Sequence, residues 1–510
     1  MKDFVQSVTD PDDCPSEVTP LENATGVSLA PYRHSFRLTN KYHRDSNLRV
    51  FIPLYATHGI NDLAPANEQI TNAIVYIQGF NRQAELSFST GRDAVKARGA
   101  EETTLLIAPV FDRHGRREEC WVPTGTRLPT PPARSAFWVT NNWIFGGNES
   151  SVIGSYTTAF DVLDELVDAL RLSRDQQGTL PYPNLRRVVI FGYSAGAQIA
   201  SRHAVFSNRQ SLEKDSDVEL RWVVSDAGSW MYLSEERPSV ECRPLYHTGI
   251  HHTCNNFRIP SLHEISSCPM YNQLRYGISH LENVKNNMYV REFGERPDLL
   301  QSRVVGFLSK DVRLIMGSED GCNCKTRGYT NADMCYWTPP GCPSSTRICC
   351  DTGLPEENPK LNRSVWNCSM VCGNVFNIGC QGLLEGSNRL QRGLNYMAHL
   401  RRLRQDLVDA HQISPSATGP VLGFYSGGHW ALPLVRSQTF YEWVIKIDEQ
   451  MISKESSRQA AWAAQPRMAF LGASAGFLLS ACFVLLALRR GTGKRRAWLE
   501  SPLLRRVSSE

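Results

Sequence analysis

The sequence carries little net charge and no basic stripe. It has 55 Lys and Arg residues against 51 Asp and Glu residues, a formal net charge of +4 over 510 residues. Nucleic-acid binding needs positive charge concentrated on one face, so this balance argues against a nucleic-acid partner. The chain is 41% hydrophobic and therefore has ample apolar material for a large core.

Convincing metal-ligand spacings are also lacking. The stretch HTGIHHTC carries His247, His251, His252 and Cys254, but no further ligand accompanies it. We expect its cysteine to belong to a disulfide instead. The sequence therefore predicts no metal and no cofactor.

The cysteines are distributed unevenly. Nine of the 15 crowd into 59 residues without a histidine and without paired C-x-x-C spacings, namely Cys322, Cys324, Cys335, Cys342, Cys349, Cys350, Cys368, Cys372 and Cys380. A loop-rich segment of this composition cannot build its own core, so we expect disulfides rather than zinc. Nine is odd, and at least one of these cysteines must pair outside the cluster, with Cys242, Cys254 and Cys268 as candidates.

The stretch LRRVVIFGYSAGAQIASRHAVF places a serine between an apolar strand and a helix. Val188–Phe191 is a continuous apolar run typical of a strand buried on both faces. Gly192 and Gly196 flank Ser194 at the G-x-S-x-G spacing, which allows an abrupt turn with the serine at its tip. The pattern predicts Ser194 as a nucleophile; the alternative is a small residue in a tight turn.

A serine nucleophile needs a base and an acid that orients the base. The stretch Val312–Gly321 begins with an apolar strand that ends at Gly317 and is followed by Asp320. The stretch Val421–Trp430 begins with another apolar run, which ends in two glycines and His429, so each candidate stands past the end of a strand. The order Ser194, Asp320, His429 is the one found in α/β-hydrolases. The alternatives are Glu319 and Asp226 for the acid, and His399 and His411 for the base.

Further apolar runs of strand length cover Leu48–Ala56, Asn72–Phe80 and Thr103–Phe111. A helical pattern with one apolar and one acidic face lies between the last of these and Ser194, over Ala159–Leu170. Strands alternate with helices, which predicts an α/β fold with a mainly parallel sheet flanked by helices.

Four stretches resemble the α/β-hydrolase superfamily, and in particular secreted or surface serine hydrolases of the esterase and lipase kind from fungi, bacteria and protists. They are NNWIFGGNES, AFDVLDELVDAL, YPNLRRVVIFGYSAGAQ and EGSNRLQRGLNY. The resemblance covers roughly residues 46–450 with a large insertion, and it implies the α/β-hydrolase fold and a Ser-His-Asp mechanism. It does not imply a substrate, because this fold hosts many chemistries.

Acyl transfer also needs an oxyanion hole made of backbone N–H groups. One donor is expected from Ala195, directly after the nucleophile, and the other from the loop IQGFNRQ, from Phe80 or Asn81. Gln78 stands where many lipases carry histidine in an HGGG motif.

An uncharged run from Met468 to Leu488 is long enough to cross a bilayer. Arginines and a lysine follow it closely, which predicts a cytoplasmic C-terminus and a catalytic domain outside the cell or in a lumen. The first residues, MKDFVQSVTDPDDCPSE, show no apolar signal-peptide core. Either a signal sequence is missing from this chain, or the chain inserts by its tail with the catalytic domain in the cytosol. The cysteines, with weaker support from sequons at Asn23, Asn148, Asn362 and Asn367, favour the former.

We therefore predict seven segments: an N-terminal extension (1–45), the first part of the core (46–321), a cysteine-rich insertion (322–384), the second part of the core (385–450), a stalk (451–467), a transmembrane helix (468–488) and a basic tail (489–510). We expect the insertion and the basic helix of residues 389–412 to overhang the active site as a cap. The predicted function is hydrolysis of an ester of a small molecule, lipid or glycan by a membrane-anchored enzyme. The alternative is a catalytically silent adhesion or receptor ectodomain on the same fold.

Overall fold

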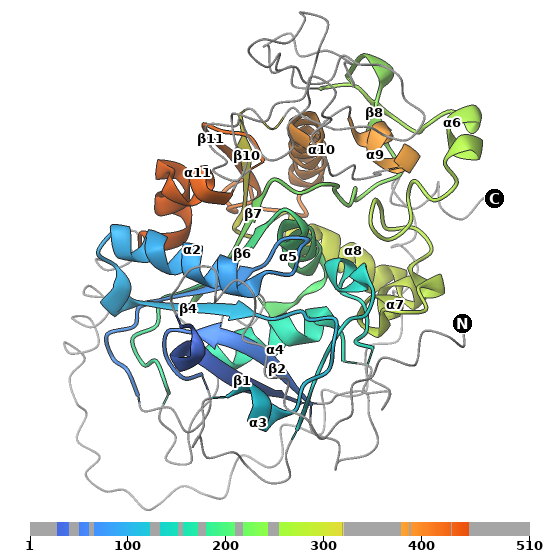
Figure 1. The fold of residues 1–510 in the computed structure, drawn as a ribbon. Helices are drawn as coiled ribbons and strands as arrows, with labels where there is room; N and C mark the ends of the chain where they lie inside the picture. Colours follow the sequence, from blue (N-terminus) through green and yellow to red (C-terminus); the bar gives the residue numbers. More distant parts are fainter. Residues whose placement is uncertain are drawn as a thin grey trace, which may run out of the picture. The chain divides into compact units, whose positions relative to one another are not determined.

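The computed structural model is shown in Figure 1. It describes residues 28–39, 50–60, 66–122, 133–150, 157–171, 180–209, 218–242, 254–318, 320, 379–386, 389–429 and 431–447. All of them belong to one compact unit, residues 1–447. Most of the predicted cysteine-rich insertion, the stalk, the transmembrane segment 468–488 and the tail lie outside the described residues. Within the described part of the chain, no helix combines the length and apolarity that a bilayer crossing requires.

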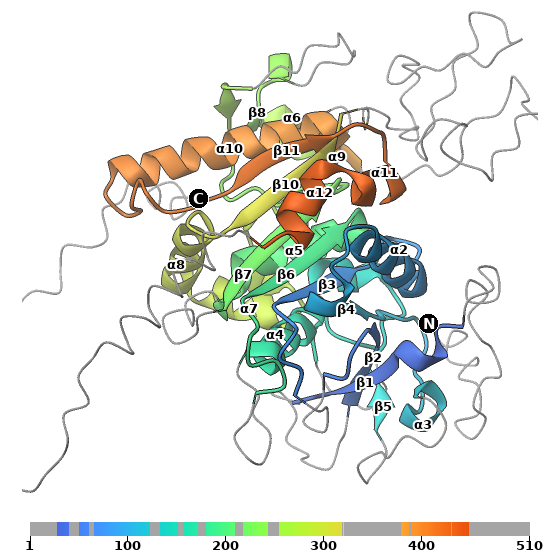
Figure 2. The same cartoon turned by 90° about the vertical axis from the view of Figure 1, so that its left-hand side faces the viewer.

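A sheet with strand order β1-β2-β4-β3-β6-β7-β10-β11 forms the centre of this unit (Figures 1 and 2). Its strands are β1 (Arg33–Leu38), β2 (Val50–Ala56), β3 (Asn72–Ile77), β4 (Thr104–Pro109), β6 (Arg187–Tyr193), β7 (Glu219–Ser225), β10 (Val312–Gly317) and β11 (Val421–Tyr425), and the short β5 (Arg134–Ser135) pairs with β2. All pairings from β4 to β11 are parallel, whereas β2 is antiparallel to both of its main neighbours. The predicted mainly parallel sheet is confirmed.

Helices cover both faces of the sheet. The helices and short helical turns are η1 (Ala30–Tyr32), α2 (Ala84–Ala97), η2 (Glu101–Thr103), α3 (Glu118–Trp121), η3 (Asn141–Phe145), α4 (Ala159–Arg171), α5 (Ala195–Phe206), η5 (Val240–Cys242), α6 (Leu262–Ser267), η6 (Leu281–Asn283), α7 (Met288–Glu295), α8 (Pro297–Phe307), α9 (Gly379–Glu385), α10 (Arg389–Asp409), α11 (Ala431–Arg436), α12 (Gln438–Phe440) and the π-helical η8 (Tyr441–Ile445). A two-stranded sheet of β8 (Arg237–Pro238) and β9 (Phe257–Arg258) lies apart from the main sheet.

The core follows from the alternation of side chains along each strand. In β6, Val188 and Ile190 point to a core shared with α4, α5, α8 and α10. Val189 and Phe191 point to the opposite core, shared with α2, α11, α12 and η8. Because successive residues of a strand face opposite sides, a strand covered on both faces must be apolar throughout.

Two sequence-based expectations need correction. Strand β1 lies inside the predicted N-terminal extension but pairs with β2 along its whole length, so the sheet begins before residue 46. The helix expected to overhang the active site is α10, and it is part of the core instead. Apolar residues spaced three or four apart are buried along it, namely Leu390, Leu394, Met397, Leu400, Leu403 and Leu407, and α10 runs beside β10 and β11 in Figure 2.

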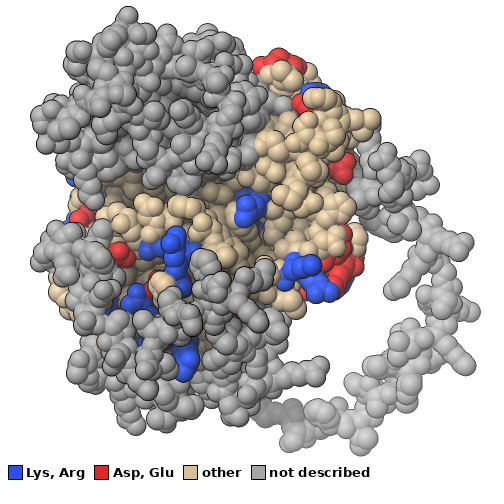
Figure 3. Space-filling model, turned by 45° about the vertical axis from the view of Figure 1, so that its right-hand side comes forward, with Lys and Arg blue, Asp and Glu red and all other residues tan. Residues whose placement is uncertain are grey.

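Charged side chains of both signs lie on the described part of the face in Figure 3, with uncharged surface between them. The predicted sequon at Asn148 lies in a partly buried loop, where its Oδ1 accepts a hydrogen bond from Met288 N–H at 3.0 Å. The other three sequons lie outside the described residues.

Candidate active site

Ser194 lies at the sharp turn between the end of β6 and the start of α5. Its backbone angles are φ 56° and ψ −112°, a left-handed conformation that residues other than glycine seldom adopt. The two flanking glycines make this turn possible. A Cβ on Gly192 would lie 2.1 Å from the carbonyl oxygen of Gly196, and a Cβ on Gly196 would lie 2.3 Å from that of Ile77. The two glycines therefore allow the strained turn that the G-x-S-x-G pattern predicts.

The structure brings Ser194, His429 and Asp320 into one hydrogen-bonded chain. His429 Nε2 lies 3.0 Å from Ser194 Oγ, and His429 Nδ1 lies 3.1 Å from Asp320 Oδ2. In this arrangement Nδ1–H donates to the carboxylate, which leaves Nε2 free to accept the serine hydroxyl hydrogen. The three side chains come from the carboxyl ends of β6, β10 and β11, which meet at the same edge of the parallel sheet.

Asp320 is held in an ionised state by its surroundings. Burial alone would raise the pKa of its carboxyl, but the charges of His429 and Arg389 and the hydrogen bond from His429 bring the pKa below its usual value. Arg389 Nη1 lies 3.4 Å from Asp320 Oδ1, and the N–H of Leu390 donates to the backbone oxygen of Asp320 at 3.0 Å. The first turn of α10 therefore holds the acid through its backbone and through the carboxylate oxygen that His429 does not contact.

An aromatic ring supports the imidazole. Tyr193 stacks on His429, with ring centroids 5.2 Å apart and an interplanar angle of 29°. Burial raises the pKa of the Tyr193 hydroxyl well above its usual value, and the nearby Asp226 and Asp320 carboxyls add to this effect. The ring therefore stays neutral and limits the movement of His429.

The two expected oxyanion donors lie on segments that touch. Ala195 is the first residue of α5, where a backbone N–H has no partner within its own helix. Phe80 lies in the turn after β3, and Gly196 packs directly against the end of β3 at Ile77 and Gln78. Gln78 is fully buried, and its Nε2 donates to the backbone oxygen of Phe111 at 3.2 Å. The Gln78 side chain thus ties this loop to the end of β4.

Arg82 holds the same loop from its other end. Its guanidinium donates to the backbone oxygens of Asp112 at 3.0 Å and Thr140 at 2.6 Å, and also to that of Trp138. Two loops, one after β4 and one before η3, therefore converge on one side chain that begins two residues after Phe80. We did not predict Arg82, because its role depends on contacts with residues about 30 to 60 positions away in the sequence.

The competing candidates lie elsewhere. Asp226 is fully buried nearby, but the carboxylate that accepts the hydrogen bond from His429 Nδ1 is that of Asp320. His399 is buried on α10, where its Nε2 accepts a hydrogen bond from Leu233 N–H at 3.2 Å. Burial lowers the pKa of His399 well below its usual value, and the charges of Arg237 and Arg402 lower it further. His411 is exposed beyond the end of α10, and Glu319 lies outside the described residues.

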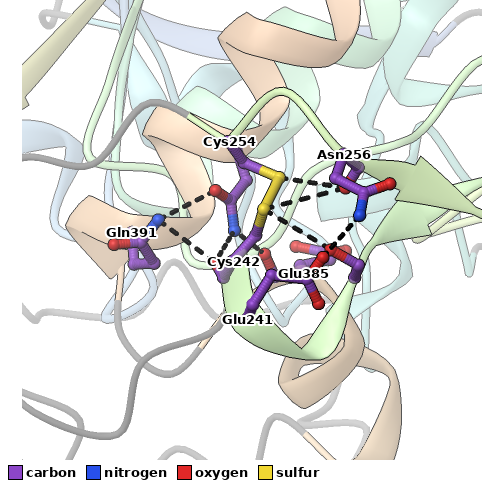
Figure 4. Close-up of a disulfide and its surroundings, with 8 residues drawn as sticks. Glu241, Cys242, Cys254, Asn256, Glu385 and Gln391 are labelled. Atoms are coloured by element: carbon purple, nitrogen blue, oxygen red, sulfur yellow. Dashed lines mark hydrogen bonds between the residues drawn. A yellow bond between two sulfur atoms is a disulfide. The ribbon is translucent and has the colours of Figure 1, made fainter.

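Two disulfides are described, and one of them involves a cysteine of the predicted insertion. Cys268 pairs with Cys380, which confirms that a cysteine of the cluster pairs outside it. Cys242 pairs with Cys254, and the backbone oxygen of Cys242 accepts hydrogen bonds from Gln391 and from Asn395 of α10 (Figure 4). Cys254 is therefore unavailable as a metal ligand. Among the described residues no cluster of three or more His, Cys, Asp and Glu side chains is arranged to hold a metal. His247, His251 and His252 lie outside them.

No protein-family model and no curated protein matches the sequence. Solved structures of similar fold include poly(aspartic acid) hydrolase-1 from Sphingomonas sp. KT-1, at 14% identity, a TM-score of 0.37 and coverage of 82% of this chain and 100% of that one. LpqC, a poly(3-hydroxybutyrate) depolymerase from Bordetella parapertussis, matches at 14% identity, a TM-score of 0.36 and coverage of 82% and 93%. The siderophore hydrolase EstB from Aspergillus nidulans matches at 12% identity, a TM-score of 0.32 and coverage of 82% and 96%. Similarity at this level carries no information about substrate.

Proposed function

We propose that this protein is a serine hydrolase that cleaves an ester through an acyl-enzyme on Ser194. The observation that carries the proposal is the hydrogen-bonded chain of Ser194, His429 and Asp320 at distances of 3.0 and 3.1 Å. A serine hydroxyl is a weak nucleophile until a neighbouring base removes its proton. The strained turn at Ser194 supports the same conclusion, since strain of this kind concentrates at functional sites.

The proposed reaction has two halves. Ser194 Oγ attacks the ester carbonyl while His429 Nε2 takes its proton, and the N–H groups of Ala195 and Phe80 stabilise the oxyanion. The tetrahedral intermediate collapses, and the leaving alkoxide receives the proton from His429 and departs as an alcohol. Water then attacks the acyl-enzyme with His429 again as base, which releases a carboxylic acid and restores Ser194.

Labelling with a fluorophosphonate probe tests this proposal on the full-length chain. We expect the probe to label the wild type, because it reacts with activated serines, and labelling to disappear in Ser194→Ala and His429→Ala. The exposed helix α6 offers matched controls, Ser266→Ala and His263→Ala, which remove the same side-chain types far from the chain of hydrogen bonds. Both should label like the wild type.

Failure of the folded wild type to react with the probe would contradict the proposal and favour the silent ectodomain. Labelling would justify a screen of esters with graded acyl-chain length, on small-molecule, lipid and glycan carriers. Substrate preference depends on the pocket shape around Ser194 and on the insertion.

We further propose that residues 468–488 anchor the enzyme in a membrane, with the catalytic domain outside the cell or in a lumen. The run is uncharged and is followed by Arg489, Arg490 and Lys494. The disulfides Cys242–Cys254 and Cys268–Cys380 support an oxidising compartment. Alkaline extraction of isolated membranes should leave the anchored protein in the membrane fraction. In intact cells or vesicles, a protease on the external or lumenal side should reach the catalytic domain. Extraction into the soluble fraction would contradict the anchor.

A further inference from the structure

A second carboxyl, Asp226, is buried beside the candidate active site without taking part in its hydrogen-bonded chain. It directly follows β7, it is 0% exposed, and its φ of 52° lies in the left-handed region. Its Oδ1 accepts the N–H of Gly317 at 2.8 Å, and its Oδ2 lies 2.7 Å from Ser225 Oγ and 2.9 Å from Tyr425 Oη. A strained, buried acid with this many contacts requires an explanation.

Each residue that Asp226 contacts is hydrogen-bonded in turn to Ser194, to Asp320 or to the residue that precedes His429. The backbone oxygen of Ser225 accepts the N–H of Ser194 at 2.9 Å, and that of Gly317 accepts the N–H of Asp320 at 3.1 Å. Tyr425 Oη lies 2.6 Å from the backbone oxygen of Gly428, the residue that precedes His429. Asp226 therefore lies at the point where the supports of the nucleophile, the acid and the base meet.

The hydrogens of these contacts can be assigned. A backbone oxygen only accepts, so the single hydroxyl hydrogen of Tyr425 goes to Gly428. The Tyr425–Asp226 contact of 2.9 Å then needs a hydrogen supplied by Asp226. With Oδ2 protonated, Asp226 donates to Tyr425 and Tyr425 donates to Gly428, while Ser225 Oγ donates to Asp226. An ionised Asp226 would leave two oxygens facing each other without a hydrogen between them.

The electrostatic surroundings agree with this assignment. Burial and the negative charge of Asp320 raise the pKa of Asp226 to about 6, against the opposing effects of His429, the Gly317 N–H and Ser225, so the protonated form dominates below about pH 6. The other titratable groups that face this carboxyl are the phenols of Tyr193 and Tyr425, whose own pKa values are raised by burial and by the two carboxyls. Two neighbouring carboxyls commonly divide in this way, with one ionised and one protonated.

We propose that Asp226 is a positioning residue that keeps its proton while Asp320 is ionised, and that the chain Asp226–Tyr425–Gly428 fixes the turn that carries His429. The proposal rests on the proposed function and deepens it, since it assigns the two acids different states. A single negative charge then faces the imidazole, and the backbone oxygen before His429 is anchored to β7.

Kinetics of full-length variants test the positioning role. Asp226→Asn should keep kcat within about fivefold of the wild type, because its carboxamide can accept from Gly317 and donate to Tyr425 as a protonated carboxyl does. Asp226→Leu and Tyr425→Phe break the chain, and each should lower kcat by about ten- to a hundredfold with KM within about twofold. Thermal unfolding of each variant shows whether the fold survives. Rescue by asparagine but not by leucine is the expected signature.

An infrared difference spectrum tests the proton itself and does not depend on activity. At about pH 5, below the raised pKa of Asp226 of about 6, the wild type minus Asp226→Asn should show the carbonyl band of a protonated carboxyl. The same subtraction made with Glu385→Gln identifies the band of Glu385, a further buried acid whose pKa is raised. If the fluorophosphonate probe fails to label the wild type but the Asp226 band is present, the proposed function fails while the proton assignment stands.

Two results would overturn the proposal. Loss of kcat in Asp226→Asn as large as in Asp320→Asn would mean that Asp226 acts as a charged acid. Absence of the carbonyl band in a folded wild type would mean that Asp226 is ionised and that the hydrogen assignment is wrong.

Discussion

The strained backbone of Ser194 depends on the two glycines that flank it. Gly192 and Gly196 pack so closely that neither has room for a Cβ. Gly196 also contacts Ile77 and Gln78, so the turn at the nucleophile and the loop with the second expected oxyanion donor hold each other in place. Small side chains are thus required by close approach on both sides of the serine.

Substituting Gly196→Ala tests this coupling. The added Cβ would lie 2.3 Å from the Ile77 carbonyl oxygen, so the start of α5 must move away from β3. We expect kcat/KM for an activated ester to fall about a hundredfold, because the N–H groups of Ala195 and Phe80 no longer converge. Gly306→Ala is the matched control in α8, where an added Cβ meets nothing within 4 Å, and it should leave turnover unchanged. Full activity of Gly196→Ala would show that the two segments adjust independently.

Asp320→Asn should lower kcat by about 10⁴-fold with little effect on stability. The amide of asparagine can donate to His429 Nδ1, which would turn the imidazole into the wrong tautomer for accepting the Ser194 proton. The measurement is steady-state hydrolysis alongside thermal unfolding. An active Asp320→Asn together with an inactive Asp226→Asn would reassign the acid to Asp226.

The sequence predicted the three hydrogen-bonded residues of the candidate site better than the residues that hold them in place. Ser194, Asp320 and His429 each follow an apolar run, and the ends of parallel strands converge wherever such a sheet forms. Arg82 and Arg389 depend on tertiary contacts that no local pattern reveals. Arg389 even belongs to a stretch that carried the family resemblance, yet its partner Asp320 is 69 residues away.

At the scale of elements, apolar runs predicted the buried strands and the edge strand β11, but not the other edge strand, β1. The sequence RHSFRL of β1 mixes polar and apolar residues, and only part of this strand is fully buried. The helix α10 was misplaced for the opposite reason. We predicted an overhanging helix from its arginines at positions 401, 402 and 404, which lie on the outer face, whereas its leucines line the inner face.

Arg187 joins two elements that are distant in sequence. It is fully buried at the start of β6, where its guanidinium donates to Asn72 Oδ1 at 3.1 Å and to the backbone oxygen of Lys446, past η8, at 2.7 Å. Arg187→Met should lower the free energy of unfolding by about 3 kcal/mol, because these buried acceptors lose their donor. Urea unfolding measures the change, and the partly exposed Arg186→Met should cost less than about 1 kcal/mol. Equal effects of the two variants would contradict the buried anchor.

For the whole molecule, the sequence predicted that the cysteine cluster pairs outside itself, but not with which residue. Cys268 and Cys380 are 112 residues apart, and only the folded chain brings them together. The sequence likewise did not predict which charged groups are buried between α10 and the sheet. Glu385 and Arg392 are both fully buried, although charged residues are seldom expected inside a core.

Glu385 gives a stability prediction with a definite sign. Burial raises the pKa of its carboxyl to about 8, although Arg392, the Trp230 N–H, Arg237 and Arg202 act in the opposite direction. The folded protein therefore holds this proton more tightly than the unfolded chain, in which the carboxyl titrates near pH 4. The stabilising effect is complete below the unfolded value and is lost as the pH rises to about 8.

Glu385→Gln should remove this pH dependence, because the amide has no proton to release. Near pH 4 the variant and the wild type should have similar free energies of unfolding. At pH 8 the variant should be the more stable by about 4 kcal/mol at most. Chemical unfolding with disulfides intact, measured across this pH range, gives the comparison. A difference between the two proteins that stays constant from pH 4 to pH 8 would mean that Glu385 is ionised in the fold and neutralised by the surrounding arginines.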